Sequence, residues 1–121
     1  MKYQVFDTPL LDEKRMEHLR KNGGGNGFST EITEMFTLRS SELIVDLDKE
    51  TLTKSVTKCK KALHSLKGIA LTMGAGRLAD ICLTIDKLIA EGEIDEAAEL
   101  MLYIKPTVAE SIEAIRAKLN I

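Results

Sequence analysis

The hydrophobic residues of this chain recur mainly at intervals of three and four, which is the spacing of amphipathic helices. The pattern predicts a short helix over about residues 13–21 and longer helices over about 30–47, 49–73, 77–91 and 95–121. No stretch alternates between hydrophobic and polar residues as a half-buried strand does. We therefore expect an all-α fold, an antiparallel four-helix bundle with a short additional N-terminal helix laid across one end.

Polar residues suited to capping a helix precede the predicted segments, and glycines follow them. The expected caps are Asp12, Ser29 or Thr30, Asp48 and Asp95. Gly74 and Gly76 should end the helix over 49–73, and Gly92 should end the next one. Pro106 interrupts the last helix, so we expect a kink or a break near residues 102–106. A kink is favoured because the hydrophobic pattern resumes in phase.

The N-terminal region carries weaker signals. Residues 1–9 have no clear period and should form a partly extended arm whose Val5 and Phe6 cover one end of the core. The glycine-rich residues 23–27 predict a flexible loop, and no Gly-Lys-Ser/Thr follows them as a phosphate-binding loop requires. The next helix should bury one hydrophobic face, namely Ile32, Met35, Phe36, Leu43, Ile44 and Leu47. The helix over 77–91 should likewise bury a stripe, namely Leu78, Ile81, Cys82, Ile85, Leu88 and Ile89.

Composition limits the chain to one domain over residues 1–121. A chain of 121 residues, 44% of them hydrophobic, is long enough for one core and too short for two ordinary domains. It has no long apolar run and no signal-peptide pattern, so we expect a cytoplasmic protein without a membrane partner. Two cysteines do not make a disulfide framework, and we expect both thiols to be reduced.

The predicted helix over 49–73 carries the most informative pattern. Its buried stripe should comprise Leu52, Val56, Cys59, Leu63, Leu66, Ala70 and Met73. His64 points roughly 130° from the centre of that stripe and should therefore be exposed. Its expected neighbours on the exposed face are Thr57, Lys60, Lys61, Gly68 and Leu71.

Positive charge is concentrated on this helix. Residues 49–73 contain six lysines and one acidic residue, although the whole chain has a net charge of −2. Arginine-rich and aromatic-interleaved patches are missing, so a nucleic-acid partner is not expected. A local surface that handles phosphate is the better interpretation.

The motif His64-Ser65-Leu66-Lys67-Gly68, followed by Gly74, Leu78 and Cys82, resembles the signature of histidine-containing phosphotransfer (HPt) domains. In that family the histidine carries a phosphoryl group on a four-helix bundle. Family members often have Leu-Glu where this chain has Ile85-Asp86, which leaves the histidine assignment intact.

The resemblance implies that His64 is the phosphoacceptor and that Lys67, three residues later, contacts the phosphate. Lys60 and Lys61 lie one helical turn before His64, close enough to add positive charge. Gly68 costs about 1 kcal/mol relative to alanine within a helix. On the exposed face, its missing side chain would leave room for the phosphoryl group and a partner's loops. Leu71 is either an isolated surface leucine or part of an apolar docking patch.

The implied mechanism is a relay in which His64 accepts phosphate from a receiver-domain aspartate and passes it to another receiver. A hybrid sensor histidine kinase is a further possible partner. The receiver would supply Mg²⁺, and we expect this chain to have no cofactor, metal site or ATP site of its own. No carboxylate lies one turn from His64, which disfavours a hydrolase, and His18 is expected to be an ordinary surface residue. The alternatives are a phosphorylation-independent adaptor and a purely structural bundle.

Overall fold

The computed structural model describes residues 3–23 and 27–121, and this part of the chain is helical without strands. A short 3-10 helix, η1 (Gln4–Asp7), precedes α1 (Glu13–Gly23) and α2 (Phe28–Ile44). The chain continues through α3 (Lys49–Lys54), α4 (Val56–Met73), α5 (Gly76–Ala90), α6 (Ile94–Met101) and α7 (Ile104–Leu119). The all-α prediction is confirmed.

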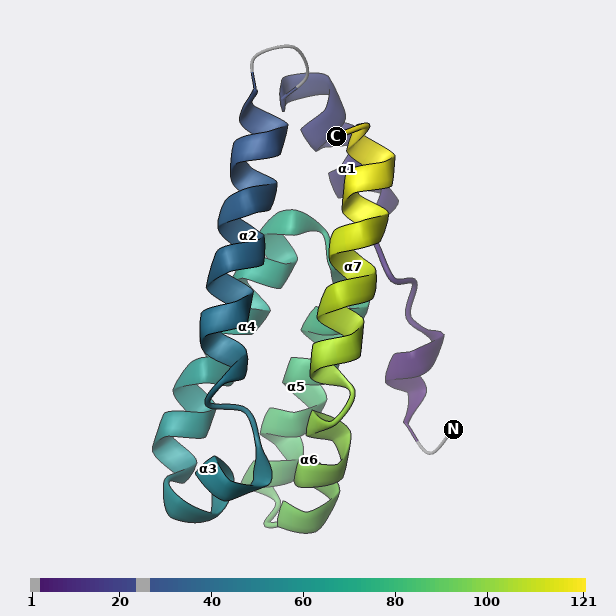
Figure 1. Cartoon of the computed structure of the whole chain (residues 1–121). Coiled ribbons are helices and arrows are strands. Elements are labelled where there is room, and N and C mark those ends of the chain that lie inside the picture. The colour runs from purple at the N-terminus through teal and green to yellow at the C-terminus, as the bar shows by residue number, and fades with distance from the viewer. Residues whose placement is uncertain (1–2, 24–26) are drawn as a thin grey trace.

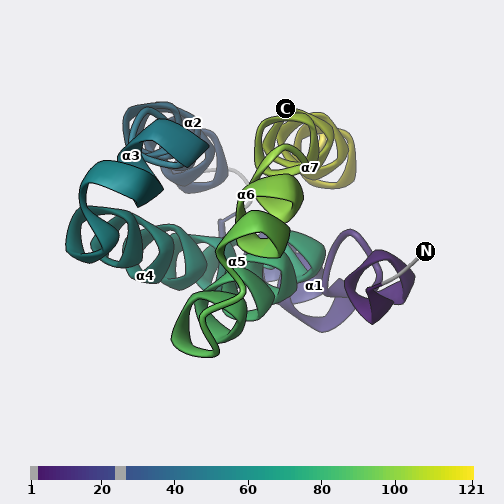
Figure 2. The same ribbon diagram turned by 90° about the horizontal axis from the view of Figure 1, so that it is seen from below.

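Four of these helices form an antiparallel bundle. α4 packs against α2 and α5, and α7 packs against the same two helices, so the four enclose one core (Figure 2). α1 contacts α2 and α7 at one end of the bundle, and α3 and α6 contact each other at the opposite end (Figure 1). Among the described residues, no helix is both long and apolar enough to cross a membrane.

The predicted hydrophobic stripes of α4 and α5 face this core. Every predicted stripe residue from Leu52 to Met73 is buried except Val56, which is 41% exposed. On α5 all six predicted residues are buried, namely Leu78, Ile81, Cys82, Ile85, Leu88 and Ile89. These two stripes explain why the α4 and α5 pair lies at the centre of the fold.

The prediction of a single helix over residues 49–73 is wrong, because the helix is interrupted at Ser55. Ser55 has an extended backbone (φ −153°, ψ 96°), and its side chain accepts a hydrogen bond from the Lys58 amide at 3.2 Å. Ser55 therefore caps α4. The break also explains the exposure of Val56, which was assigned to a continuous helical wheel.

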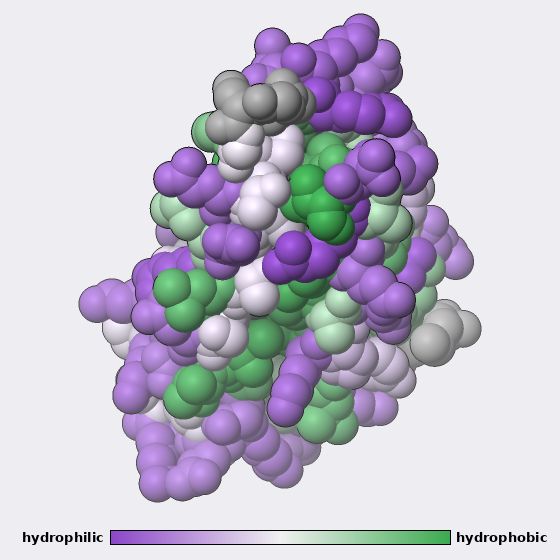
Figure 3. Space-filling view, turned by 45° about the horizontal axis from the view of Figure 1, so that its top comes forward, coloured by the Kyte–Doolittle hydropathy of each residue, from purple (hydrophilic) through white to green (hydrophobic). Residues whose placement is uncertain are grey.

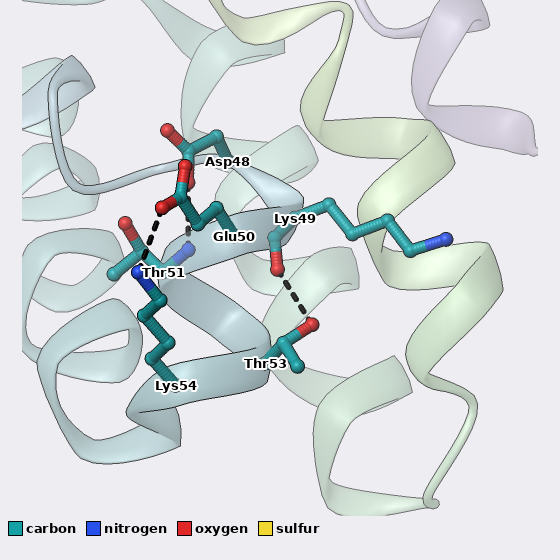
Figure 4. A network of polar contacts seen from close by, with 6 residues as sticks. All are labelled: Asp48, Lys49, Glu50, Thr51, Thr53 and Lys54. Atoms are coloured by element: carbon teal, nitrogen blue, oxygen red, sulfur yellow. Dashed lines mark hydrogen bonds and ion pairs between the residues drawn. The ribbon is translucent and has the colours of Figure 1, made fainter.

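The short helix α3 is held by its own polar contacts (Figure 4). Asp48 caps it as predicted, accepting a hydrogen bond from the Thr51 amide at 2.7 Å. This bond lowers the pKa of the Asp48 carboxyl below its ordinary value of 3.8. One turn later, Lys54 pairs with Glu50 at 2.8 Å. With a cap on each of α3 and α4, the chain can turn at Ser55.

The start of α2 also differs from the prediction. The helix begins at Phe28, after Gly27 in the left-handed conformation (φ 79°), so Ser29 and Thr30 lie inside it and do not cap it. The buried Ser29 hydroxyl instead donates to the Leu19 carbonyl at 3.4 Å, joining α2 to α1. Met35, expected in the core, is 65% exposed. Leu47 is buried just beyond the end of the helix, and the core also contains Phe36 and Leu43, with Ile32 and Ile44 partly buried against it.

The turn between α4 and α5 depends on Gly74. Its φ of 74° lies in the left-handed region, and an added Cβ would lie 2.7 Å from the Met16 side chain. Gly76 was expected to break the helix, but it is the first residue of α5. Gly92 does follow α5 in the left-handed conformation, as predicted.

The last predicted helix is two helices, α6 and α7. Leu102 and Tyr103 keep right-handed helical dihedrals. Their amides, however, donate to the carbonyls of Glu99 and Leu100, three residues back instead of the four of an α-helix. Pro106 lies in the first turn of α7, where its missing N–H costs no helical hydrogen bond. The chain therefore has a break where we favoured a kink. Asp95 is not the cap either, because it lies inside α6.

The N-terminal segment is more ordered than the predicted extended arm. Residues 4–7 form η1, which packs against α5 and buries Val5. The ring of Phe6 packs edge-to-face with that of Tyr103, with 4.8 Å between the ring centroids. Asp12 caps α1 as predicted, accepting from the Lys14 amide at 3.0 Å. Of the loop predicted over 23–27, residues 24–26 lie outside the described part of the chain.

Candidate functional site

The candidate site lies on the outer face of α4. The buried residues of α4 include Leu63 and Leu66, which fix the rotation of the helix against α2 and α5. That rotation leaves His64 exposed, as the sequence pattern predicts. In the described chain, the imidazole forms no ion pair or hydrogen bond with another residue. The ring is therefore accessible to a partner.

The structure brings His64 together with lysines on both sides. His64, Lys60 and Lys67 line a pocket of about 160 Å³ between α4 and α5. On its other side, His64 borders a shallow hollow lined by Lys60, Lys61, Thr57 and Ser65. Each of the three predicted lysines therefore lines a hollow that His64 also lines, and their positive charge would attract a phosphoryl group electrostatically.

Gly68 and Leu71 lie on the same face but do not line either hollow. Gly68 is exposed, and a Cβ added to it would meet no atom within 4 Å. Close packing of helices therefore does not require a glycine at this position. Leu71 is 58% exposed, and both interpretations of it stay open.

Asp86 on α5 is a member of the site that the sequence analysis did not select. It lines the pocket with His64, and its carboxylate lies 3.9 Å from the Lys60 ammonium. Asp86 lies on α5 and His64 on α4, so the spacing of residues along the His64 helix gives no indication of Asp86. The sequence does indicate that Asp86 and His64 lie at similar levels of an antiparallel hairpin, because they are nearly equidistant from the turn at Gly74.

Cys82 also lines this pocket. Both cysteines are free and buried. Burial raises the pKa of the Cys82 thiol to about 12, although the nearby positive charge of Lys67 opposes the shift. Burial, followed by the charges of Asp48 and Asp46, raises the pKa of Cys59 to about 11. Neither thiol is a ready nucleophile at neutral pH.

Comparison with known families decides the classification of this fold. The Hpt domain family matches residues 31–118, which extend from the first turn of α2 to the last turn of α7. The chain belongs to the Hpt domain family. Comparisons with curated proteins and with solved structures give no match.

Membership in the Hpt family has two direct consequences. The general function of Hpt domains is histidine phosphotransfer in phosphorelays, so this chain is assigned to that process. The matched region contains all four bundle helices and the candidate site, whereas η1 and α1 lie before it. The N-terminal segment is therefore an addition that packs on the Hpt bundle.

The two histidines of this Hpt domain have different surroundings. His64 lies within the matched region, and His18 lies before it on α1. His18 is exposed and its imidazole Nδ1 is 3.2 Å from the amide nitrogen of Asn22. It lines neither of the two lysine-lined hollows that His64 lines. His64 is thus the candidate for phosphate chemistry.

Within the described residues, no group of three or more histidine, cysteine and carboxylate side chains is arranged to hold a metal ion. Asp86 is the carboxylate in the His64 pocket, which two lysines, Lys60 and Lys67, also line. This donor set suits a phosphate better than a divalent cation, because two ammonium groups repel a cation.

Proposed function

We propose that this Hpt domain accepts a phosphoryl group on His64 from the phosphorylated aspartate of a response-regulator receiver domain. An imidazole nitrogen attacks the phosphorus, an N–P bond forms, and the bond from phosphorus to the aspartyl oxygen breaks. The receiver carboxylate leaves, and the proton of the attacking imidazole passes to solvent. In the reverse sense, the phosphoryl group passes from His64 to the aspartate of a second receiver.

One observation carries this proposal. The histidine within the Hpt match is exposed beside a pocket that places Lys60 and Lys67 next to it. Positive side chains stabilise the charge of a phosphoryl group in transfer. The open surface at Gly68 gives a partner access one turn from the imidazole.

The chemistry that this chain lacks must come from the partner. A receiver domain would contribute its Mg²⁺ and the groups that activate the aspartyl phosphate. A hybrid sensor histidine kinase with its own receiver could serve as the donor. A cytoplasmic location fits this partnership and the free thiols, and it stays a prediction.

A second groove, which shares no lining residue with the two hollows beside His64, offers a place for a partner to dock. It has a volume of about 550 Å³ between α2 and α4, and its lining includes Phe28, Ile32, Met35 and Ile69. Met35 is 65% exposed, and hydrophobic patches interrupt the hydrophilic surface on the face that includes α2 (Figure 3). Exposed hydrophobic surface of this kind is typical of protein interaction sites.

The same groove favours the second candidate, an adaptor that binds partners without phosphate transfer. Incubation with a receiver carrying radiolabelled phosphate separates the two functions. A phosphotransfer protein acquires label that is acid-labile and base-stable, whereas an adaptor binds the receiver and stays unlabelled.

Two variants make the assay specific. His64→Gln should abolish labelling, and His18→Gln should leave it unchanged, because each removes one exposed imidazole. Labelling that survives in His64→Gln would contradict the assignment. A domain that associates into oligomers but never takes label would instead support the structural-bundle alternative.

A further inference from the structure

The charged pair between Lys60 and Asp86 lies beside His64, and the transfer step described above uses Lys60 but gives Asp86 no role. The Lys60 ammonium and the Asp86 carboxylate are 3.9 Å apart, and their side chains are 45% and 47% exposed. Among the described residues, the Asp86 carboxylate has no other ion pair or hydrogen bond. The pair joins α4 to α5 across the pocket that His64 lines.

The pair is loose enough to exchange partners. Exposed ion pairs at such distances contribute little to stability, because water screens them and long side chains lose freedom in forming them. A phosphoryl group carries more negative charge than a carboxylate and offers three acceptor oxygens. Once one is attached to His64, Lys60 gains a stronger partner than Asp86.

Phosphorylation also changes the charge balance of the pocket. Lys60, Lys67 and Asp86 together give the empty pocket a charge of about +1, and a phosphoryl dianion would make it about −1. Asp86 would then be a carboxylate without its lysine, facing a second anion. Like charges this close repel each other.

We propose that Asp86 is a positioning residue that holds Lys60 beside His64 in the empty state and weakens retention of the phosphoryl group afterwards. Lys60 exchanges Asp86 for the phosphate, and the carboxylate that it leaves destabilises the phosphorylated form. Asp86 thereby favours onward transfer to a receiver. This inference rests on the proposed function of His64.

The test measures the equilibrium of phosphoryl transfer between a phosphorylated receiver domain and this 121-residue chain. Asp86→Asn should shift it toward phosphorylated His64 by about three- to tenfold, because the variant frees Lys60 and removes the repulsion. The shift should shrink as salt concentration rises. Glu113→Gln on α7 removes the same charge from an exposed residue and should leave the equilibrium unchanged.

A second variant tests the exchange of partners. In a Lys60→Gln background, Asp86→Asn should have a smaller effect than in the wild type, because no lysine remains to be released. Equal effects in both backgrounds would overturn the exchange. Melting temperatures should stay within a few degrees in all variants, so a large loss of stability would indicate a structural role instead.

Phosphoramidate, a small phosphoryl donor, separates failure of this inference from failure of the proposed function. If neither the receiver nor phosphoramidate labels wild-type His64, the proposed function is wrong and the Asp86 role falls with it. If His64 is labelled but Asp86→Asn and Glu113→Gln give the same equilibrium as wild type, only the role of Asp86 is overturned.

Discussion

Gly68 is the residue at which stability and function should respond in opposite directions. An added Cβ meets nothing within 4 Å, so a good helix former is accommodated there. Gly68→Gln should therefore stabilise the domain by up to about 1 kcal/mol. The longer side chain would obstruct a partner's approach to His64, so the transfer rate should fall at least about tenfold. A tenfold fall corresponds to an increase of about 1.4 kcal/mol in the activation free energy.

Gly68→Ala is the matched control for that variant. It should give a similar gain in unfolding free energy, measured by denaturant titration, and keep most of the transfer rate because a methyl group fills little space. Normal transfer by Gly68→Gln would mean that the glycine does not keep the approach open.

Lys67 should contribute more to transfer than a lysine remote from the pocket. Losing a hydrogen bond from a charged group costs about 1.5–3 kcal/mol, so Lys67→Ala should slow transfer about tenfold or more. Lys54→Ala removes the same charge from α3, where Lys54 pairs with Glu50. Single-turnover rates that fall equally in both variants would show that only the overall positive charge matters.

The buried Cys82 thiol predicts a dependence of stability on alkaline pH. Its pKa is raised to about 12 in the folded protein, against an ordinary value of 9.0. The folded state therefore keeps a proton that the unfolded chain loses above pH 9.0. The resulting stabilisation is complete below that pH and disappears as pH rises toward 12.

Denaturant titrations of the wild type and Cys82→Ala between pH 8 and 11 test this. Because other groups titrate in both proteins, the informative quantity is the difference between their unfolding free energies. That difference should be constant below about pH 9 and shrink above it. A difference that stays constant to pH 11 would contradict the raised pKa.

At the scale of the helices, hydrophobic spacing predicted which faces are buried better than it predicted where helices end. The stripes of α4 and α5 are nearly all correct because burial of a whole face depends on many residues. The break at Ser55 was not predicted because hydrophobic residues continue at helical spacing across it in the sequence, at Leu52, Val56 and Cys59. Leu100 and Ile104 similarly stay buried across the break between α6 and α7.

The candidate site was predictable where it depends on a single helix. His64 and its neighbours on α4 share a face by periodicity alone, and the structure leaves that face exposed. Asp86 and the groove between α2 and α4 depend on contacts between helices. These contacts follow from the packing of the bundle, and local spacing in the sequence does not contain them.

The cap at Ser55 gives a prediction at this scale. Ser55→Ala removes the oxygen that accepts from the Lys58 amide at 3.2 Å, and should lower the unfolding free energy by about 1 kcal/mol. Denaturant titration measures the loss. Ser41→Ala on the exposed face of α2 is a control, because its hydroxyl bonds a carbonyl within the helix and caps nothing. A loss no larger than the control's would mean that the break does not depend on this cap.

At the scale of the whole molecule, the N-terminal segment packs on helices other than the exposed face of α4 that carries His64. η1 packs on α5 and α1 packs on α2 and α7, whereas the outer face of α4 stays open around His64. The N-terminal segment contributes Val5, Leu11, Met16 and Leu19 to the core. The fold therefore buries hydrophobic residues on other faces and leaves the candidate site accessible.

The most direct measurement of the central claim is a two-step transfer followed by peptide mapping. The Hpt protein is first labelled by a phosphorylated receiver, and the attachment site is located by mass spectrometry under basic conditions that preserve phosphohistidine. Fresh unphosphorylated receiver is then added. We predict phosphate on the peptide containing His64 and none on the peptide containing His18. That phosphate should then be transferred to the receiver aspartate. Phosphate at another residue, or phosphate on His64 that no receiver removes, would contradict it.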